Sequence, residues 1–376
     1  MIEIRNILTT FVALYLKQND MRKFTTLQFL FIFSISILAQ IPSGYYNTAV
    51  GKADAALKTA LFNKIAAHTE RSYTQLWTDF QTTDKRADGK VWDMYSTCTF
   101  TFGTHQDSGS GGGAECQYYN REHSFPKSWF KDNYPMYSDL FHLYPTDKFV
   151  NAERGNFPFG ETNGSTTYSN GSKLGSSSFS GYSGTVFEPT NEYKGDFART
   201  YFYMVTAYED KVATWNTSNV NASPHLNETS YPTFTSWTID LLIKWHRQDP
   251  VSTKETNRNN AVYGIQGNRN PFIDYPMLAE HIWGTKKGIQ WSTTSGIDDL
   301  KIEFSVSPNP ASKFLNVKTD EQNTTYRIIS LNGMLVESKK LNTSGTISIE
   351  QLNDGMYFIE LQMGNRKAIQ KFVVNN

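Results

Sequence analysis

Apolar side chains recur at helical spacing in several parts of the chain. A repeat of three to four residues predicts an amphipathic helix with one buried stripe. Four segments show this pattern: 50–66, 197–208, 234–246 and 255–266. The third is the clearest, because its largest apolar residues fall on one stripe that we expect to lie in the core: Trp237, Leu241, Leu242 and Trp245.

Between the first two helices the pattern is weaker. Residues 91–102 are predicted to form a strand, with Tyr95 and Phe100 in the core. The Gly- and Ser-rich residues 106–113 are typical of a loop. Residues 162–185 show no clear period and predict either a long surface loop or irregular strands.

The pattern changes near residue 297, where short β-type runs begin. Six runs are predicted as strands: 304–306, 314–317, 326–329, 346–349, 356–361 and 368–374. Three dipeptides between them suit tight hairpin turns: Asn332-Gly333, Asp354-Gly355 and Gly364-Asn365. Residues 298–376 are therefore predicted to be a small antiparallel β-sandwich.

The N-terminal region is typical of a secretory signal peptide. Met21, Arg22 and Lys23 precede the apolar residues 24–38, and the polar chain resumes after Ala39. We expect translation to begin at Met21 and cleavage near residue 40. The alternative is an N-terminal membrane anchor. Residues 41–297 then form the main domain.

Charge and cysteine content narrow the function. The chain has 36 Lys and Arg against 36 Asp and Glu, and the main domain is slightly acidic. Binding of nucleic acid through overall charge is therefore excluded, and a local basic cleft or a bound cation would be needed. Cys98 and Cys116 lack zinc-site spacing, so we predict a disulfide, worth about 3 kcal/mol in the loop-entropy model. The alternative is two free thiols.

Two segments, 120–129 and 138–156, concentrate reactive side chains. Phosphodiester hydrolysis needs a base, a cation near the phosphate and donors that hold the phosphate in line. Histidine is the natural base near neutral pH, oxygen ligands suit Mg²⁺ or Ca²⁺, and arginine binds phosphate in bidentate fashion. The two segments contain candidates for all three roles: His123, Glu122, Asn151, Arg121 and Arg154.

The adjacent pair Glu122-His123 poses a geometric problem. Neighbours on a regular strand face opposite sides of the sheet, so both can serve one site only at a strand end or a bulge. Pro126 follows three residues later, which favours a strand end.

The chain resembles the endonuclease I family, bacterial periplasmic and extracellular nucleases with a ββα-metal (His-Me finger) site. The resemblance covers about residues 50–285. Its motifs occur in order at 91–96, 121–123, 139–145, 151–154, 158–160, 195–204, 245–250 and 266–272. It implies an α+β fold for the main domain and sugar-nonspecific cleavage of DNA and RNA that leaves 5′-phosphates.

Carried onto this sequence, the resemblance implies that His123 is the general base. It also implies that Glu122 and Asn151 hold one divalent ion, Mg²⁺ with Ca²⁺ or Mn²⁺ as alternatives, and that the helix bearing Asn151 is the α of ββα. Phosphate-binding candidates are the arginines Arg121, Arg154 and Arg199 and the nearby lysines Lys127, Lys131 and Lys148.

Several of these residues have a structural alternative. Arg199 is equally consistent with an anchor for a core carboxylate. His142 is either a partner that orients the metal site or a core histidine. Asp147 is expected to cap the following helix. The stretch between His123 and Asp139 is short for the family, so a phosphate-binding arginine found there elsewhere has no clear counterpart.

The tail resembles the C-terminal sorting domain of the type IX secretion system. The motifs are Ser307-Pro308-Asn309-Pro310, Leu331-Asn332-Gly333 and residues 352–357. The resemblance implies a partner in the secretion machinery and an extracellular or cell-surface location. An adhesive or carbohydrate-binding β-module is the alternative. For the whole chain, the competing functions are a ribonuclease or phosphodiesterase on the same site and a non-catalytic surface-displayed binding module.

Overall fold

The computed structural model describes residues 41–293, 304–319, 324–341, 344–363 and 366–375. The predicted signal peptide at 1–40, the predicted domain boundary at 297–298 and the turn at Gly364-Asn365 lie outside the described residues. Within those described ranges, no helix is both long and apolar enough to cross a membrane.

Residues 41–293 combine helices with two small sheets around one large core and a small second cluster of buried apolar residues. The helices are α2 (Asp54–Ile65), α3 (Leu76–Thr83), α4 (Lys148–Arg154), α5 (Lys194–Ala207), α6 (Ser236–Gln248), α7 (Thr253–Gln266), α8 (Pro271–Asp274) and α9 (Leu278–Ile282), with 3-10 turns η1 (Asn47–Ala49), η2 (Lys127–Phe130), η3 (Met136–Ser138), η4 (Asn191–Tyr193) and η5 (Val212–Thr214). The four predicted helices are confirmed as α2, α5, α6 and α7.

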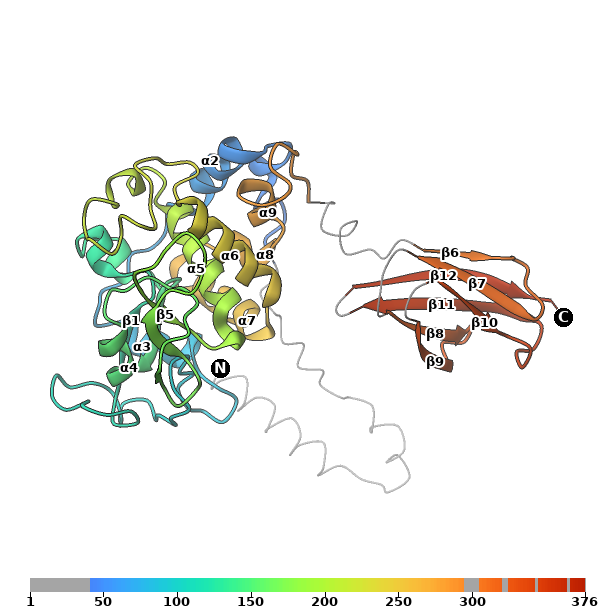
Figure 1. Ribbon diagram of the computed structural model, residues 1–376, viewed down its shortest axis with the longest axis horizontal. Helices are drawn as coiled ribbons and strands as arrows, with labels where there is room; N and C mark the ends of the chain where they lie inside the picture. Colours follow the sequence, from blue (N-terminus) through green and yellow to red (C-terminus); the bar gives the residue numbers. More distant parts are fainter. Residues whose placement is uncertain (1–40, 294–303, 320–323, 342–343, 364–365, 376) are drawn as a thin grey trace, which may run out of the picture. The chain divides into compact units, whose positions relative to one another are not determined.

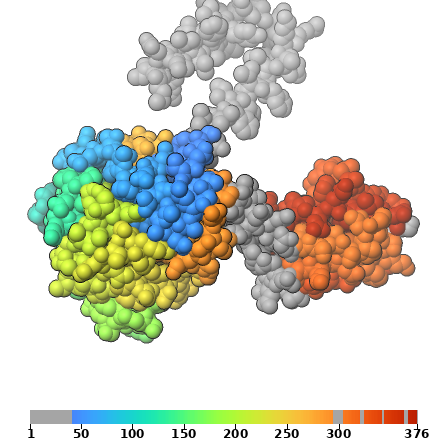
Figure 2. All heavy atoms as spheres, turned by 90° about the horizontal axis from the view of Figure 1, so that it is seen from above, coloured from blue at the N-terminus to red at the C-terminus, as the bar shows by residue number. Residues whose placement is uncertain are grey.

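Helix α5 is the central element of this core. All of its residues are buried, and it packs against α2, α6 and α8. Figure 1 shows α5 and α6 side by side. The apolar stripe predicted on α6 is buried against it. Helix α2 also contacts α9, and Figure 2 shows these distant parts of the sequence, blue and orange, as neighbours on the surface.

The strands of this region form two antiparallel sheets. One pairs β1 (Tyr119–His123) with β2 (Leu143–Asp147). The other has the order β3-β4-β5, formed by Thr166–Thr167, Lys173–Ser176 and Thr185–Glu188. Residues 162–185 therefore contain short strands, which is the second of the two predicted alternatives.

The prediction of a strand over residues 91–102 is wrong. Only Val91 forms a β-bridge, to Lys85, and the rest of the segment is irregular. The Asp93 carboxylate accepts hydrogen bonds from the Tyr95 amide and the Ser96 hydroxyl. Such local side-chain bonds offer the backbone an alternative to a strand ladder. The core prediction still holds, because Tyr95 and Phe100 are buried.

The tail is an all-β sandwich of two antiparallel sheets. Its strands are β6 (Phe304–Ser307), β7 (Phe314–Thr319), β8 (Thr324–Ser330), β9 (Leu335–Leu341), β10 (Gly345–Ser348), β11 (Gly355–Met363) and β12 (Arg366–Val374). The sheet orders are β10-β7-β6 and β12-β11-β8-β9. Alternate residues of both sheets, such as Leu315, Ile328 and Ile359, form one apolar core. This confirms the predicted fold class of the tail.

Two details of the tail differ from the prediction. Strand β9 was not predicted; it is an edge strand, mostly exposed and carrying Lys339 and Lys340, so it lacks apolar alternation. Asn332-Gly333 does join paired strands, β8 and β9, as predicted. Asp354-Gly355 does not form a hairpin turn, because β11 pairs with β8 and β12.

Candidate functional site

The reactive residues lie on a compact unit of two strands and one helix. Strands β1 and β2 pair antiparallel, with His123 opposite Leu143 and Tyr119 opposite Asp147. Helix α4 follows β2 without a linker and packs against both strands. Strand β1 ends at His123, as the nearby Pro126 indicated. The two predicted segments are therefore adjacent in space.

Alternation along β1 separates the reactive residues into two sets. Arg121 and His123, two residues apart, project from one face, and the Tyr73 ring covers both: it stacks on His123 and lies 3.6 Å from the Arg121 guanidinium carbon. Asn120 and Glu122 project from the other face and bond to residues of α4. We call these the aromatic face and the polar face of β1.

His123 is held as a neutral imidazole with one free nitrogen. Its Nε2 lies 3.0 Å from the Tyr137 carbonyl oxygen. A carbonyl only accepts hydrogen bonds, so Nε2 carries the proton and Nδ1 holds the lone pair. Burial, reinforced by the neighbouring His142, holds the pKa of His123 well below its usual range. Nδ1 is therefore unprotonated at neutral pH and can accept a proton.

Glu122 is buried on the polar face. One oxygen, Oε1, accepts hydrogen bonds from the Tyr95 hydroxyl at 2.7 Å and from Arg154 Nη1 at 2.8 Å. Burial raises the pKa of Glu122, while Arg154 and Tyr95 act in the opposite direction. The His123 backbone amide also donates to this carboxylate. Both side-chain donors bond Oε1, and within the described ranges no side chain donates a hydrogen bond to the other oxygen, Oε2.

Asn151, the other predicted metal ligand, lies on α4 and is half-buried. Its Nδ2 donates to Asn120 Oδ1 at 2.7 Å, which ties the first half of α4 to the polar face. Within the part of the chain that the structure describes, the Asn151 side-chain oxygen accepts no hydrogen bond. Glu122 and Asn151 thus each keep one oxygen to which no described side chain donates, a hard donor of the kind that Mg²⁺ binds.

Arg154 binds both the Glu122 carboxylate and the backbone at the end of β1 from the protein interior. Its side chain is completely buried, and besides Glu122 it donates to the carbonyl oxygens of His123 and Ser124 at 3.0 and 2.7 Å. These bonds fix the backbone at the end of β1. The predicted contact with a substrate phosphate does not fit this position, because the guanidinium faces the protein interior.

Arg199 and His142 also lie in the interior. Arg199 is completely buried on α5 and forms a bidentate ion pair with Glu255, which favours the predicted alternative of a core anchor. His142 is buried beside His123, with ring centroids 5.4 Å apart, and its Nε2 bonds the Met136 carbonyl. The two histidines therefore hold consecutive carbonyls of η3, and no described bond links His142 to Asn151.

The remaining basic candidates are nearer to solvent. The Arg121 guanidinium is half-buried between the rings of Tyr73 and Trp77 and donates to the Tyr73 carbonyl. Lys127 is exposed and pairs with Asp132, and Lys131 is also exposed. Lys148 pairs with Asp107 at 2.8 Å. Of these, Arg121 is on the same face as His123.

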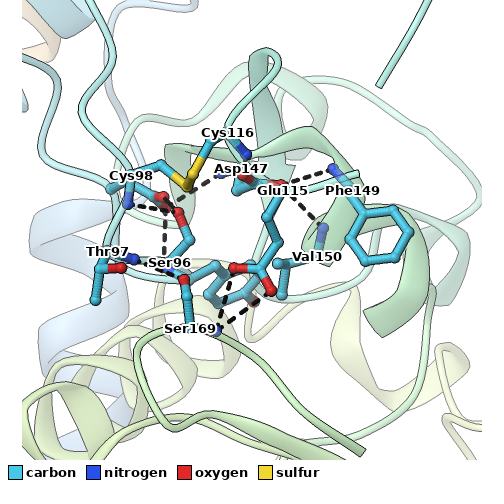
Figure 3. Close-up of a disulfide and its surroundings, with 11 residues drawn as sticks. Ser96, Thr97, Cys98, Glu115, Cys116, Asp147, Phe149, Val150 and Ser169 are labelled. Carbon is cyan, nitrogen blue, oxygen red and sulfur yellow. Dashed lines mark hydrogen bonds between the residues drawn. A yellow bond between two sulfur atoms is a disulfide. The ribbon is translucent and has the colours of Figure 1, made fainter. Parts of the chain in front are cut away.

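A disulfide is linked through Asp147 to helix α4, whose residues bond the polar face. Cys98 and Cys116 are bonded, as predicted, and the Cys116 amide donates to Asp147 Oδ2 at 2.7 Å (Figure 3). The other Asp147 oxygen caps α4 by accepting from the amides of Phe149 and Val150. The predicted cap is therefore confirmed, and it connects the disulfide loop to the helix that carries Asn151.

Sequence reasoning missed the aromatic surroundings of His123. Tyr73 precedes α3, well before His123 in the sequence, and Tyr137 lies in η3, 14 residues after His123. Their ring centroids lie 5.8 and 5.1 Å from that of His123. Neither residue belongs to a motif, so only the tertiary structure could find them.

Comparison with known proteins identifies the class. Residues 305–375 match the secretion system C-terminal sorting domain. An extracellular ribonuclease of Bacillus amyloliquefaciens is 36% identical over 248 residues, 64% of this chain and 78% of that protein. An extracellular deoxyribonuclease of Aeromonas hydrophila is 28% identical over 140 residues, 37% of this chain and 50% of that protein. The protein is a secreted nuclease.

The family follows from the main domain. Residues 53–277, more than half of the chain, match the Endonuclease I family. A second extracellular ribonuclease, from Bacillus subtilis, is 34% identical over 250 residues, again 64% of this chain and 78% of that protein. The chain belongs to the endonuclease I family and ends in a type IX sorting domain.

Proposed function

We propose that the protein is a metal-dependent endonuclease that hydrolyses phosphodiester bonds in RNA and DNA, with His123 as the general base. The observation that carries this proposal is the bond from His123 Nε2 to the Tyr137 carbonyl, which leaves Nδ1 free at the end of β1. Family membership and relatives named as ribonucleases and deoxyribonucleases support it.

In the proposed reaction, His123 Nδ1 removes a proton from a water molecule. The water oxygen bonds to phosphorus while the bond from phosphorus to the 3′ oxygen breaks, and the leaving oxygen takes a proton from solvent. The low pKa of His123 favours the neutral base before the reaction. The Tyr137 carbonyl accepts from the ring throughout and stabilises the imidazolium that forms.

Glu122 and Asn151 would hold one divalent cation, Mg²⁺ or alternatively Ca²⁺ or Mn²⁺, through these side-chain oxygens. The bound cation would stabilise the charge that develops on the phosphate and the leaving oxygen. The Arg154 cation favours the ionised form of Glu122, against the burial that raises its pKa, and orients the carboxylate. In this interpretation β1, β2 and α4 form the ββα-metal motif, and a phosphate across the end of β1 reaches both of its faces.

Digestion of single-stranded RNA and of plasmid DNA tests the proposal. Mg²⁺ should support cleavage and a chelator should abolish it. The variant His123→Ala should lose about 10²-fold or more in rate, the usual contribution of a general base. His246→Gln, which changes a buried histidine on α6, should keep near wild-type activity. Undiminished activity of His123→Ala would reject the assignment of the base.

A ribonuclease without action on DNA is the second candidate. It is favoured by the relatives named ribonucleases, which are more similar and match over more of their length than the deoxyribonucleases do. Cleavage of RNA with the plasmid left intact would select this candidate. Failure to cleave either substrate would favour a non-catalytic binding module.

A further inference from the structure

Three tyrosines form a continuous aromatic surface beside His123. The Tyr73 ring lies nearly parallel to the imidazole, at 19°, and contacts Tyr137 with centroids 4.5 Å apart. Tyr137 in turn contacts Tyr134, at 5.3 Å. We call Tyr73, Tyr134 and Tyr137 the tyrosine platform. Its outer member, Tyr134, is two ring contacts away from the proposed base.

Tyr134 is unusual in its exposure. Its side chain is 46% exposed, and among the described residues of 41–293 it is the only aromatic side chain in the exposed class. Every other described aromatic ring of this region is buried or half-buried. Tyr134 therefore contributes little to the core, and its exposed ring is available to a flat apolar partner.

The loop before Tyr134 has an unfavourable backbone. Lys131 and Asp132 both adopt positive φ angles, 60° and 56°, a conformation that residues with a Cβ avoid. Such strain is concentrated at functional sites, where the surrounding structure maintains it. The Lys127 ammonium group, 3.3 Å from Asp132, also lies 5.4 Å from the Tyr137 ring centroid and so connects the loop to the platform.

We propose that Tyr134 stacks an unpaired nucleobase next to the phosphodiester at His123, so that the enzyme prefers single-stranded nucleic acid. This inference rests on the proposed function. Bases in a duplex already stack on their neighbours, whereas an unpaired base can lie on an aromatic ring. Every base has a π-face, so the contact tolerates any sequence.

The charged residues around the tyrosine platform favour a nucleic-acid strand over a free base as the ligand. Lys127, which contacts the Tyr137 ring, and Lys131, in the loop before Tyr134, are both exposed. The Arg121 guanidinium lies against the Tyr73 ring, which also stacks on His123. Asp132 offsets part of this charge through its pair with Lys127. We expect Arg121 and Lys131 to contact backbone phosphates near a stacked base.

The test compares Tyr134→Ala, Tyr134→Phe and the control Ile289→Ala, an exposed apolar residue elsewhere. The substrates are single-stranded RNA and DNA oligonucleotides, the matched duplex, and a DNA strand with abasic sites around one cleavable linkage. Tyr134→Ala should raise KM on both single strands about 5–10-fold with kcat unchanged, the low end for one stacked base. Tyr134→Phe keeps the ring and should behave as wild type, as should Ile289→Ala.

On the abasic strand, wild type and Tyr134→Ala should have equal KM. A Tyr134→Ala enzyme that matches wild type on the intact strands, or that loses as much on the abasic strand, would overturn the stacking proposal. Wild-type cleavage that is fastest on the duplex would overturn it too. Absence of all nuclease activity, or full activity in His123→Ala, would instead reject the proposed function on which it rests.

Discussion

The two faces of β1 each hold one proposed functional side chain in place, Glu122 or His123, but through different kinds of contact. On the polar face, Glu122 is fixed by the buried Arg154 guanidinium and the Tyr95 hydroxyl. On the aromatic face, His123 is fixed by one carbonyl and by stacked rings, and its pKa is lowered. A carboxylate needs nearby donors to stay ionised when buried, whereas burial itself keeps a histidine neutral. The polar face therefore supplies donors that oppose the raised pKa of Glu122, and the aromatic face supplies the burial that keeps His123 neutral.

The largest expected effect comes from breaking the polar face at Arg154. Arg154→Met would leave Glu122 buried without its cation and free two carbonyls at the end of β1. Removing one partner of a buried ion pair typically costs about 3–5 kcal/mol. Urea unfolding should show that loss, and nuclease activity should fall with it.

Arg121→Met is the matched change on the aromatic face. Its guanidinium is half-buried and held mainly by two rings, a contact worth about 0.5–2 kcal/mol. We expect a smaller stability loss than for Arg154→Met. Equal losses in the two variants would show that the faces do not differ in the way described.

The next expected effect is the pH dependence of stability that two buried histidines contribute. Burial lowers the pKa of His142, and it lowers that of His246 to about 4, with the Arg199 charge as the second cause. Both side chains stay neutral in the fold while the unfolded chain takes up protons near pH 6.5, so their contribution to stability falls as pH drops below about 6.5. Buried carboxylates with raised pKa values, such as Asp93 at about 7, contribute with the opposite sign. For His246 the loss amounts to about 2 kcal/mol at pH 5.

Glutamine variants separate these contributions. Gln can still donate to the Met136 or Pro276 carbonyl but does not titrate. Compared with wild type, His142→Gln, beside His123, and His246→Gln, on α6, should each lose less unfolding free energy when the pH is lowered from 7.5 to 5. An unchanged pH dependence in both variants would contradict the neutral assignment.

Local patterns were sufficient for the outline of the site. The alternation rule, with Pro126 close behind, required a strand end at Glu122-His123, and β1 ends there. The Asp147 cap was recognisable because the residue stands directly before a helix. These features depend on neighbours within a few residues, which the sequence displays.

Features that depend on tertiary contacts were not predictable. Nothing near Arg154 in the sequence shows whether it binds a substrate phosphate or bonds groups in the protein interior. Its burial depends on elements that are distant in the chain, including Tyr201 on α5. Tyr73 and Tyr137 meet His123 only after folding. The failed strand at 91–102 has the same origin, since Asp93 also accepts a hydrogen bond from the distant Asp147 amide.

The smallest expected effect is that of substitutions at Asp147. They test whether the position of α4 depends on the link to the disulfide loop. Asp147→Ala removes both the α4 cap and the link to Cys116, and loss of a cap costs about 1 kcal/mol. Asp147→Asn retains a good cap but turns an amide toward the Cys116 amide, so only the link is lost. Because α4 carries Asn151, both variants should need more Mg²⁺ for half-maximal activity, Asp147→Ala the more so. If Asp147→Asn loses as much as Asp147→Ala, the link to the disulfide loop positions α4 and the cap adds little. If Asp147→Asn equals wild type, the cap alone suffices and the disulfide contributes only to stability.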